Sequence, residues 1–60
     1  MDERTKQAVK TWLEVCDQQA DSLTRDERNF LEYAYDQFAF KGGLTEDQMT
    51  RLKQMYDKVV

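Results

Sequence analysis

Two helix-capping sequences determine most of what this chain can fold into. Thr24–Glu27 and Thr45–Gln48 each place a threonine three residues before a Glu or Gln. In such a capping box the threonine hydroxyl accepts a hydrogen bond from the later amide, and the later side chain accepts one from the threonine amide. No proline occurs in the chain, and Gly42-Gly43 precedes the second box, where glycine can end a helix in the left-handed conformation. These signals predict helices over 25–41 and 46–59.

A further helix is predicted upstream, over about 3–19. Val9, Trp12, Leu13 and Cys16 recur at intervals of three and four residues, which places them on one helical stripe. Three helices in 60 residues predict an all-α fold, a compact three-helix bundle formed as a single domain by residues 1–60. The apolar stripes and the segments between them predict a core of Val9, Trp12, Leu13, Cys16, Leu23, Phe30, Leu31, Ala34, Phe38, Leu44, Met49, Leu52, Met55, Tyr56 and Val59.

The composition of the chain indicates the cellular compartment in which it works. No stretch approaches the roughly 18 consecutive apolar residues of a membrane span, so we expect no membrane partner. The first ten residues lack the apolar region of a secretory signal. The single cysteine, Cys16, cannot form an internal disulfide, which favours a reducing compartment. We therefore expect a cytoplasmic protein, located in the host cytoplasm if a phage encodes it.

Few residues are suited to catalysis. The chain has no histidine, so it lacks the commonest general base, the usual partner of a cysteine nucleophile and the commonest metal ligand. Cys16 lies on an apolar stripe and is interpreted as a small buried hydrophobe. The acidic pairs at 26–27 and 46–47 are explained by their positions in first helical turns. We expect no enzymatic activity, no cofactor and no metal site.

Negative charge is concentrated in the middle of the chain. Seven carboxylates and two arginines lie between residues 14 and 36, a net charge of −5, whereas the whole chain carries −3. Such a surface attracts basic proteins and repels phosphate. A solvated helix face would show the same charge pattern, so both interpretations stay open.

The predicted second helix carries more aromatic residues than one core stripe requires. Tyr33 and Phe40, seven residues apart, point together toward a different side from Leu31 and Phe38. Either the helix is central and buries a wide face, or Tyr33 and Phe40 form a contact surface for a basic partner or a second copy. The predicted partner-binding residues are Glu14, Asp17, Asp21, Asn29, Glu32, Tyr33, Asp36, Gln37 and Phe40.

A spaced pattern covers about half of the chain, in Asp26–Leu31, Leu44–Gln48, Leu52, Met55 and Tyr56. It resembles a short helical pair found in small phage and bacterial accessory proteins of DNA processing. The pattern of those proteins is W-E-R-x-F-L, then L-T-E-K-Q, then L-x-x-I-Y. Here Asp26 replaces the tryptophan and Asp47 replaces the lysine. The resemblance implies a phage or mobile-element origin and work near a DNA-handling complex, and it implies no reaction.

Three functional hypotheses follow. The first is a non-enzymatic protein-binding module, a small phage-type inhibitor or accessory factor (anti-CRISPR-like) whose acidic, aromatic surface mimics DNA and binds a basic, nucleic-acid-handling protein. The second is a small helix-turn-helix DNA-binding protein that uses helix 46–59, with Arg51, Lys53 and Lys58 facing DNA. A pI near 4.7 disfavours direct nucleic-acid binding. The third is a self-assembling structural subunit, such as a homodimer.

Overall fold

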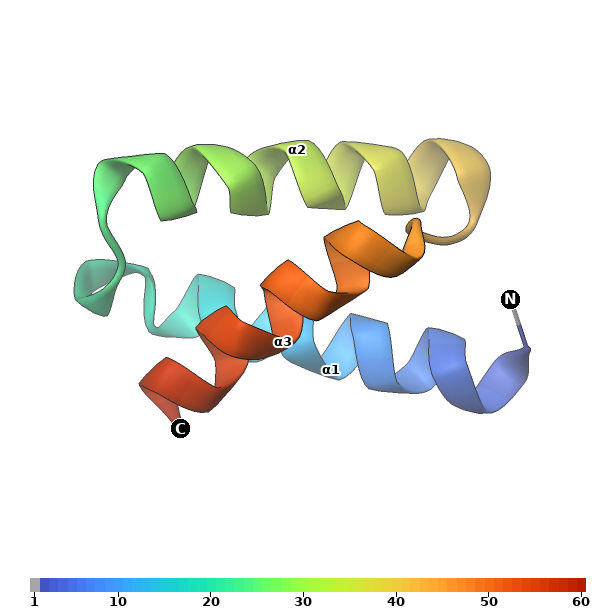
Figure 1. Cartoon of the computed structure of the whole chain (residues 1–60), viewed down its shortest axis with the longest axis horizontal. Helices are drawn as coiled ribbons and strands as arrows, with labels where there is room; N and C mark the ends of the chain where they lie inside the picture. Colours follow the sequence, from blue (N-terminus) through green and yellow to red (C-terminus); the bar gives the residue numbers. More distant parts are fainter. Residues whose placement is uncertain (1) are drawn as a thin grey trace.

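Three α-helices and one short 3-10 turn form the computed structural model, which describes residues 2–60 (Figure 1). The elements are α1 (Glu3–Gln18), η1 (Ala20–Ser22), α2 (Arg25–Lys41) and α3 (Glu46–Val59). The described residues contain no strand, and the domain measures 29 × 19 × 18 Å. The predicted all-α, three-helix fold is therefore confirmed. Over these same residues, no helix is both long and apolar enough to cross a membrane.

Both predicted capping boxes are present and nearly identical in geometry. At the start of α2, the Thr24 amide donates to Glu27 Oε1 at 2.9 Å and the Glu27 amide donates to Thr24 Oγ1 at 3.2 Å. Thr45 and Gln48 repeat these bonds at 2.9 and 3.2 Å at the start of α3. Each box satisfies two amides that have no partner within their own helix. Local sequence therefore sets where both helices begin.

Gly42 ends α2 as predicted. Its backbone adopts the left-handed conformation, with φ at 72°, and its amide donates to the Phe38 carbonyl at 2.9 Å. An L-residue with a side chain would be strained in this conformation. The turn to α3 therefore depends on glycine at this position.

Helix α1 begins at an aspartate cap and ends in a tighter turn. The Asp2 carboxylate accepts a hydrogen bond from the Thr5 amide at 2.7 Å, and this bond lowers the pKa of Asp2. After Gln18 the chain tightens into η1 and then turns extended at Leu23, whose side chain is buried. The tight turn reverses the chain within a few residues, so α2 runs back along α1 (Figure 1).

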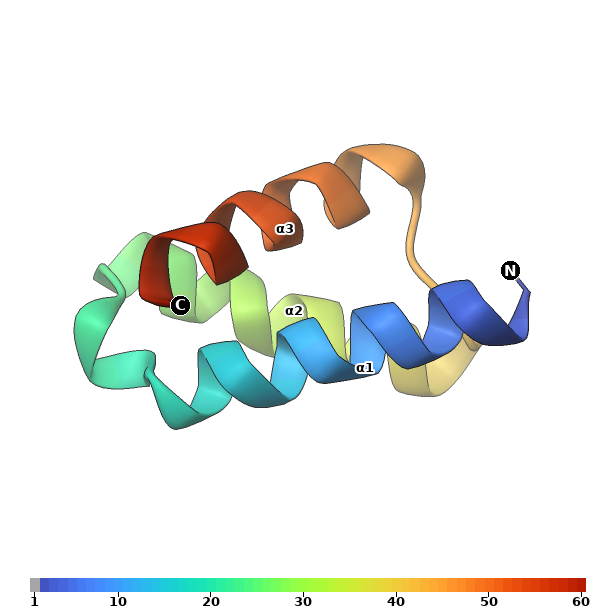
Figure 2. The ribbon, with the colours of Figure 1, turned by 90° about the horizontal axis from the view of Figure 1, so that it is seen from below.

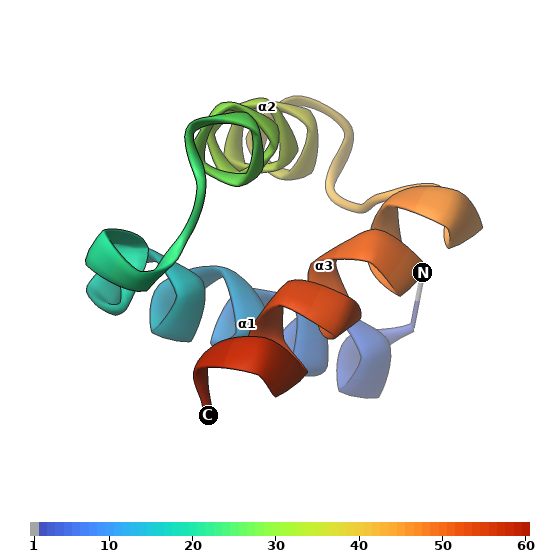
Figure 3. The same ribbon diagram turned by 60° about the vertical axis from the view of Figure 1, so that its left-hand side comes forward.

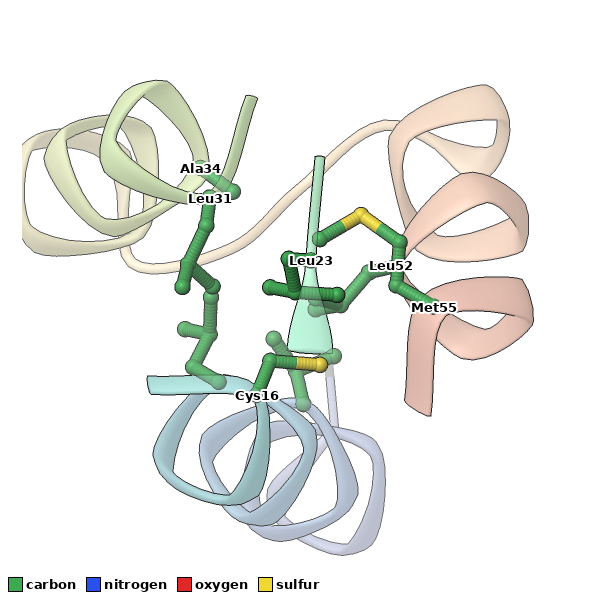
Figure 4. Packing of buried hydrophobic residues seen from close by; sticks show 8 residues of the cluster. Cys16, Leu23, Leu31, Ala34, Leu52 and Met55 are labelled. Carbon is green, nitrogen blue, oxygen red and sulfur yellow. The ribbon is translucent and has the colours of Figure 1, made fainter. Parts of the chain in front are cut away.

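The three helices enclose one apolar core. Helices α1 and α2 run antiparallel, and α3 crosses them obliquely, as Figures 2 and 3 show. Helix α1 packs most closely against α3 and less closely against α2. The eight buried side chains in Figure 4 come from all three helices and from the segment before α2. They are Val9, Leu13, Cys16, Leu23, Leu31, Ala34, Leu52 and Met55, and the seven other predicted core residues pack against them.

Contacts at the edge of the core attach α3 to its neighbours. The rings of Trp12 and Tyr56 lie 6.3 Å apart in a tilted arrangement, which joins α1 to α3. Lys58 Nζ lies 2.9 Å from Glu27 Oε1, so the last turn of α3 is linked to the first turn of α2. Glu27 thus serves the α2 cap and an ion pair at once.

Candidate partner-binding surface

Helix α2 turns two large aromatic side chains toward solvent. Phe40 is 91% exposed and Tyr33 is 50% exposed, whereas Leu31 and Ala34 on the opposite side of the helix are buried. Helix α2 does contact both other helices, as one interpretation expected, but it does not bury Tyr33 and Phe40, so that part of the interpretation is wrong. Both neighbouring helices lie on the same side of α2, as Figure 3 shows, so its other side has no helix against it. The alternative interpretation of Tyr33 and Phe40 as a contact surface remains.

A hollow of about 310 Å³ lies between α2 and the end of α1. We call it the acidic hollow, and it is lined by Asp17, Ala20, Arg28, Leu31, Glu32, Tyr35 and Asp36. The fold therefore brings together three of the predicted partner-binding carboxylates, one from α1 and two from α2. Ala20 and Leu31 supply apolar lining, and Arg28 adds one positive charge to the three carboxylates. A mixture of charged and apolar side chains is the composition expected of a protein-binding site.

Tyr35 was not among the predicted site residues, yet it belongs to the acidic hollow. Its side chain is 37% exposed. Partial burial raises the pKa of Tyr35, and the nearby carboxylates of Asp17 and Glu14 raise this pKa further. The phenol therefore stays protonated and can donate a hydrogen bond at neutral pH. Its position at the margin of the α2 apolar stripe was the available signal in the sequence.

A second hollow, of about 380 Å³, lies at the turn between α2 and α3. We call it the turn hollow, and it is lined by Tyr33, Gln37, Lys41, Gly42, Gly43, Leu44, Thr45 and Gln48. The predicted surface is thus divided, because Tyr33 and Gln37 line the turn hollow while the clustered carboxylates line the acidic hollow. The predicted residues Glu14, Asp21, Asn29 and Phe40 are exposed and line neither hollow.

Cys16 lies inside the core and is no part of either hollow. Its side chain is fully buried. Burial raises the pKa of the Cys16 thiol, and the negative charge of Glu27 raises it further, so the thiol is protonated at neutral pH. The prediction that this cysteine packs as a small hydrophobe is confirmed. Among residues 2–60, no group of three or more Cys, Asp or Glu side chains is placed to hold a metal ion.

Two of the three cations of α3 make contacts inside the domain. The Arg51 guanidinium lies over the Phe30 ring, 4.7 Å from its centroid, and Lys58 pairs with Glu27. All three cations, with Lys53, remain exposed, so the helix-turn-helix hypothesis stays a prediction.

Comparison with known proteins gives no match. No protein-family model matches the chain, and neither a curated protein nor a solved structure shows significant similarity to it. The resemblance to DNA-processing accessory proteins therefore stays a prediction from its motifs.

Proposed function

We propose that this chain is a non-enzymatic protein-binding module that recognises a basic protein through the acidic hollow and the carboxylates beside it. The observation that carries the proposal is the convergence of Asp17, Glu32 and Asp36, from two helices, on one hollow whose lining contains a single cation, Arg28. Glu14 and Asp21 lie close to Asp17 in the sequence, are exposed and add to the negative charge. The surface attracts cationic proteins over a distance comparable to the Debye length.

The chemistry of the hollow suits a lysine or arginine side chain. Such side chains have an apolar stem and a charged head, and the lining of the hollow contains both apolar side chains and carboxylates. The Tyr35 ring, partly exposed at the same place, offers a surface on which a guanidinium can stack. The partner class we propose is a nucleic-acid-handling protein, since such proteins expose basic surfaces for phosphate.

In this role the carboxylates stand in for the phosphates of a nucleic acid. The chain would then act as an inhibitor or accessory factor that occupies the phosphate-binding surface of its partner. A phage-type inhibitor of the anti-CRISPR class is one concrete form of this function. The motif resemblance to phage and bacterial DNA-processing accessory proteins supports that setting, and the acidic hollow supports the mode of binding.

The direct test removes charge from the hollow while keeping side-chain shape. We expect Asp17→Asn combined with Glu32→Gln to weaken binding to the partner at least about tenfold, because a basic surface loses two charge-assisted contacts. The partner is first identified by capture from bacterial lysate and mass spectrometry. It is then purified, and its affinity for the wild-type chain is measured by calorimetry at two salt concentrations.

The matched control is Glu3→Gln combined with Asp57→Asn. It removes the same charge from exposed positions outside the hollow and should leave the affinity within about threefold. Competition with duplex DNA for the purified partner would support DNA mimicry. Equal affinity of the hollow and control variants contradicts the proposal. So does tight binding of the chain itself to duplex DNA with a steep salt dependence, which would favour the helix-turn-helix hypothesis.

A further inference from the structure

Tyr35 of α2 has a counterpart in α3. The segment Leu23–Asp36 aligns with Leu44–Asp57 without a gap, so Tyr35 and Tyr56 take the same position after the capping threonine of their helix. Each tyrosine is followed by an aspartate. The two helices also begin with the same cap geometry. The surroundings of the two tyrosine rings can therefore be compared directly.

The fold covers one of these two rings and leaves the other open. Trp12 of α1 packs against Tyr56, with ring centroids 6.3 Å apart and ring planes tilted by 47°. In the acidic hollow, α1 and η1 contribute only Asp17 and Ala20 beside Tyr35. These side chains are too small to cover a ring, and Tyr35 stays 37% exposed. The Tyr35 ring thus has space beside it for a planar side chain of a partner.

The charge of the acidic hollow decides which kind of planar side chain fits there. Its lining holds three carboxylates, Asp17, Glu32 and Asp36, and one cation, Arg28, which leaves a net charge of −2. Arg28 forms no ion pair among residues 2–60. A neutral aromatic ring would leave the carboxylates without a counter charge. A guanidinium is both planar and positively charged, so it suits the ring and the carboxylates together.

We propose that the acidic hollow binds arginine in preference to lysine, and that Tyr35 determines this preference. The inference rests on the proposed function, because it names the side chain through which the basic partner enters the hollow. The guanidinium stacks on the Tyr35 ring, and its N–H groups donate hydrogen bonds to the carboxylates of the lining.

Lysine gains only part of this interaction. Its ammonium group is a compact and strongly hydrated charge, whereas the guanidinium is flat and more weakly hydrated. Both cations are attracted by the carboxylates. The guanidinium also gains the stacking contact with the ring. The difference in affinity between arginine and lysine therefore comes from Tyr35, while the carboxylates contribute to the binding of both.

An arginine already lies over an aromatic ring elsewhere in this domain. The Arg51 guanidinium is 4.7 Å from the centroid of the Phe30 ring. Arg51 is exposed and Phe30 is only partly buried, so this contact forms at a hydrated surface. The same contact at Tyr35 would form in a comparable setting, with carboxylates added around it.

The experiment compares two labelled peptides that differ only in their cation, one alternating glycine with arginine and the other alternating glycine with lysine. Fluorescence anisotropy at low salt gives both dissociation constants. We expect the wild-type chain to bind the arginine peptide about fivefold or more tighter. Tyr35→Leu should bring the two constants to within about twofold of each other, mainly by weakening the arginine peptide. Tyr35→Phe should keep the preference, because the ring makes the stacking contact.

Tyr33→Leu is the matched control. Tyr33 is an exposed tyrosine of the same helix that lines the turn hollow and no part of the acidic hollow. This variant should keep the preference for arginine, and the circular dichroism of all three variants should match that of the wild type. A preference that survives Tyr35→Leu overturns the proposal, as does one that Tyr33→Leu removes to the same extent.

The outcomes also distinguish this inference from the proposed function. If both peptides bind equally well and Asp17→Asn combined with Glu32→Gln weakens both, the proposed function stands and arginine selection is wrong. If the wild type binds neither peptide, both proposals are wrong. If arginine is preferred but the loss of the two carboxylates has no effect, the peptide binds outside the acidic hollow and both proposals again fail.

Discussion

The inner and outer sides of α2 both carry aromatic residues, and these residues have opposite roles. On the inner side, Leu31 and Ala34 are buried and Phe38 packs against the core. On the outer side, the rings of Tyr33 and Phe40 remain exposed. Hydrophobicity alone therefore does not decide which aromatic of this helix enters the core. The side on which α1 and α3 pack decides it.

The two sides of α2 also contribute to different properties, the inner side to stability and the outer side to recognition. Burial of the inner side holds the fold together, because the free energy gained scales with apolar area removed from water. The outer aromatic side chains contribute little of that free energy in the monomer. Their exposure is instead a property of the surface that a partner or a second copy would cover. Substitutions on the two sides should accordingly affect different measurements.

The largest expected difference comes from truncating one large side chain on each side. Leu31→Ala should lower the free energy of unfolding by about 2–4 kcal/mol, because Leu31 is 4% exposed and its removal leaves a cavity in the core. Phe40→Ala, at a 91% exposed position, should change the free energy by less than about 0.5 kcal/mol. Urea unfolding at a concentration where the chain is monomeric measures both. Comparable losses in the two variants would show that Phe40 packs against the domain.

Replacing each of the two alanines of α2 by leucine should give a smaller difference in stability between the two sides of the helix, from a more closely matched pair of substitutions. Ala34 is fully buried and Ala39 is exposed. Ala34→Leu should cost about 1–3 kcal/mol, because the added methylene and methyl groups have no space in a packed core. Ala39→Leu should stay within about 0.5 kcal/mol, since leucine is nearly as good a helix former as alanine. Thermal unfolding of both variants checks this, and an unaffected Ala34→Leu would mean that the core has room beside Ala34.

The smallest expected effect concerns Glu27, the carboxylate where the start of α2 meets α3. The Thr24 amide and then Lys58 hold the pKa of Glu27 below its ordinary value of about 4.5. Because the folded chain binds this proton less readily than the unfolded chain, the stabilisation is present above pH 4.5 and is lost as the pH falls through the folded pKa. Glu27→Gln should keep the cap, because Gln48 caps α3 in the same way. It should also make the free energy of unfolding less dependent on pH in this range.

The Lys58→Gln variant tests how much of this pH dependence comes from Lys58. The hydrogen bond from the Thr24 amide is the largest single cause of the lowered pKa of Glu27, and Lys58 lowers this pKa through a hydrogen bond and through its charge. Part of the pH dependence should therefore survive Lys58→Gln, and it should disappear in Glu27→Gln. The pH dependence is measured as the free energy of unfolding in urea between pH 3 and 6, because a carboxylate titrates in that range (about pH 4). If the free energy of unfolding depends on pH as steeply in Glu27→Gln as in the wild type, the Glu27 carboxylate is excluded as the source of the pH dependence.

Sequence reasoning predicted the fold and the core because both depend on local or periodic signals. Thr24 and Thr45 start their helices through hydrogen bonds within four residues, and the apolar spacing identified all fifteen residues of the core cluster. The 3-10 turn after Gln18 and the cap at Asp2 were not predicted. The acidic hollow was predicted only in part, because Asp17 and Glu32 meet through the packing of α1 on α2.

The sequence by itself determined where α2 begins and ends, where α3 begins and which stripe of each helix is apolar. Hydrogen bonds of the caps and the period of the helix are properties of a few neighbouring residues, so they need no tertiary contact. Only the tertiary structure decided that Tyr33 and Phe40 lie outside the core, that Tyr35 joins the acidic hollow, and that the predicted surface is divided in two. These facts depend on where two other helices lie around α2. The length and charge of one helix do not contain that information.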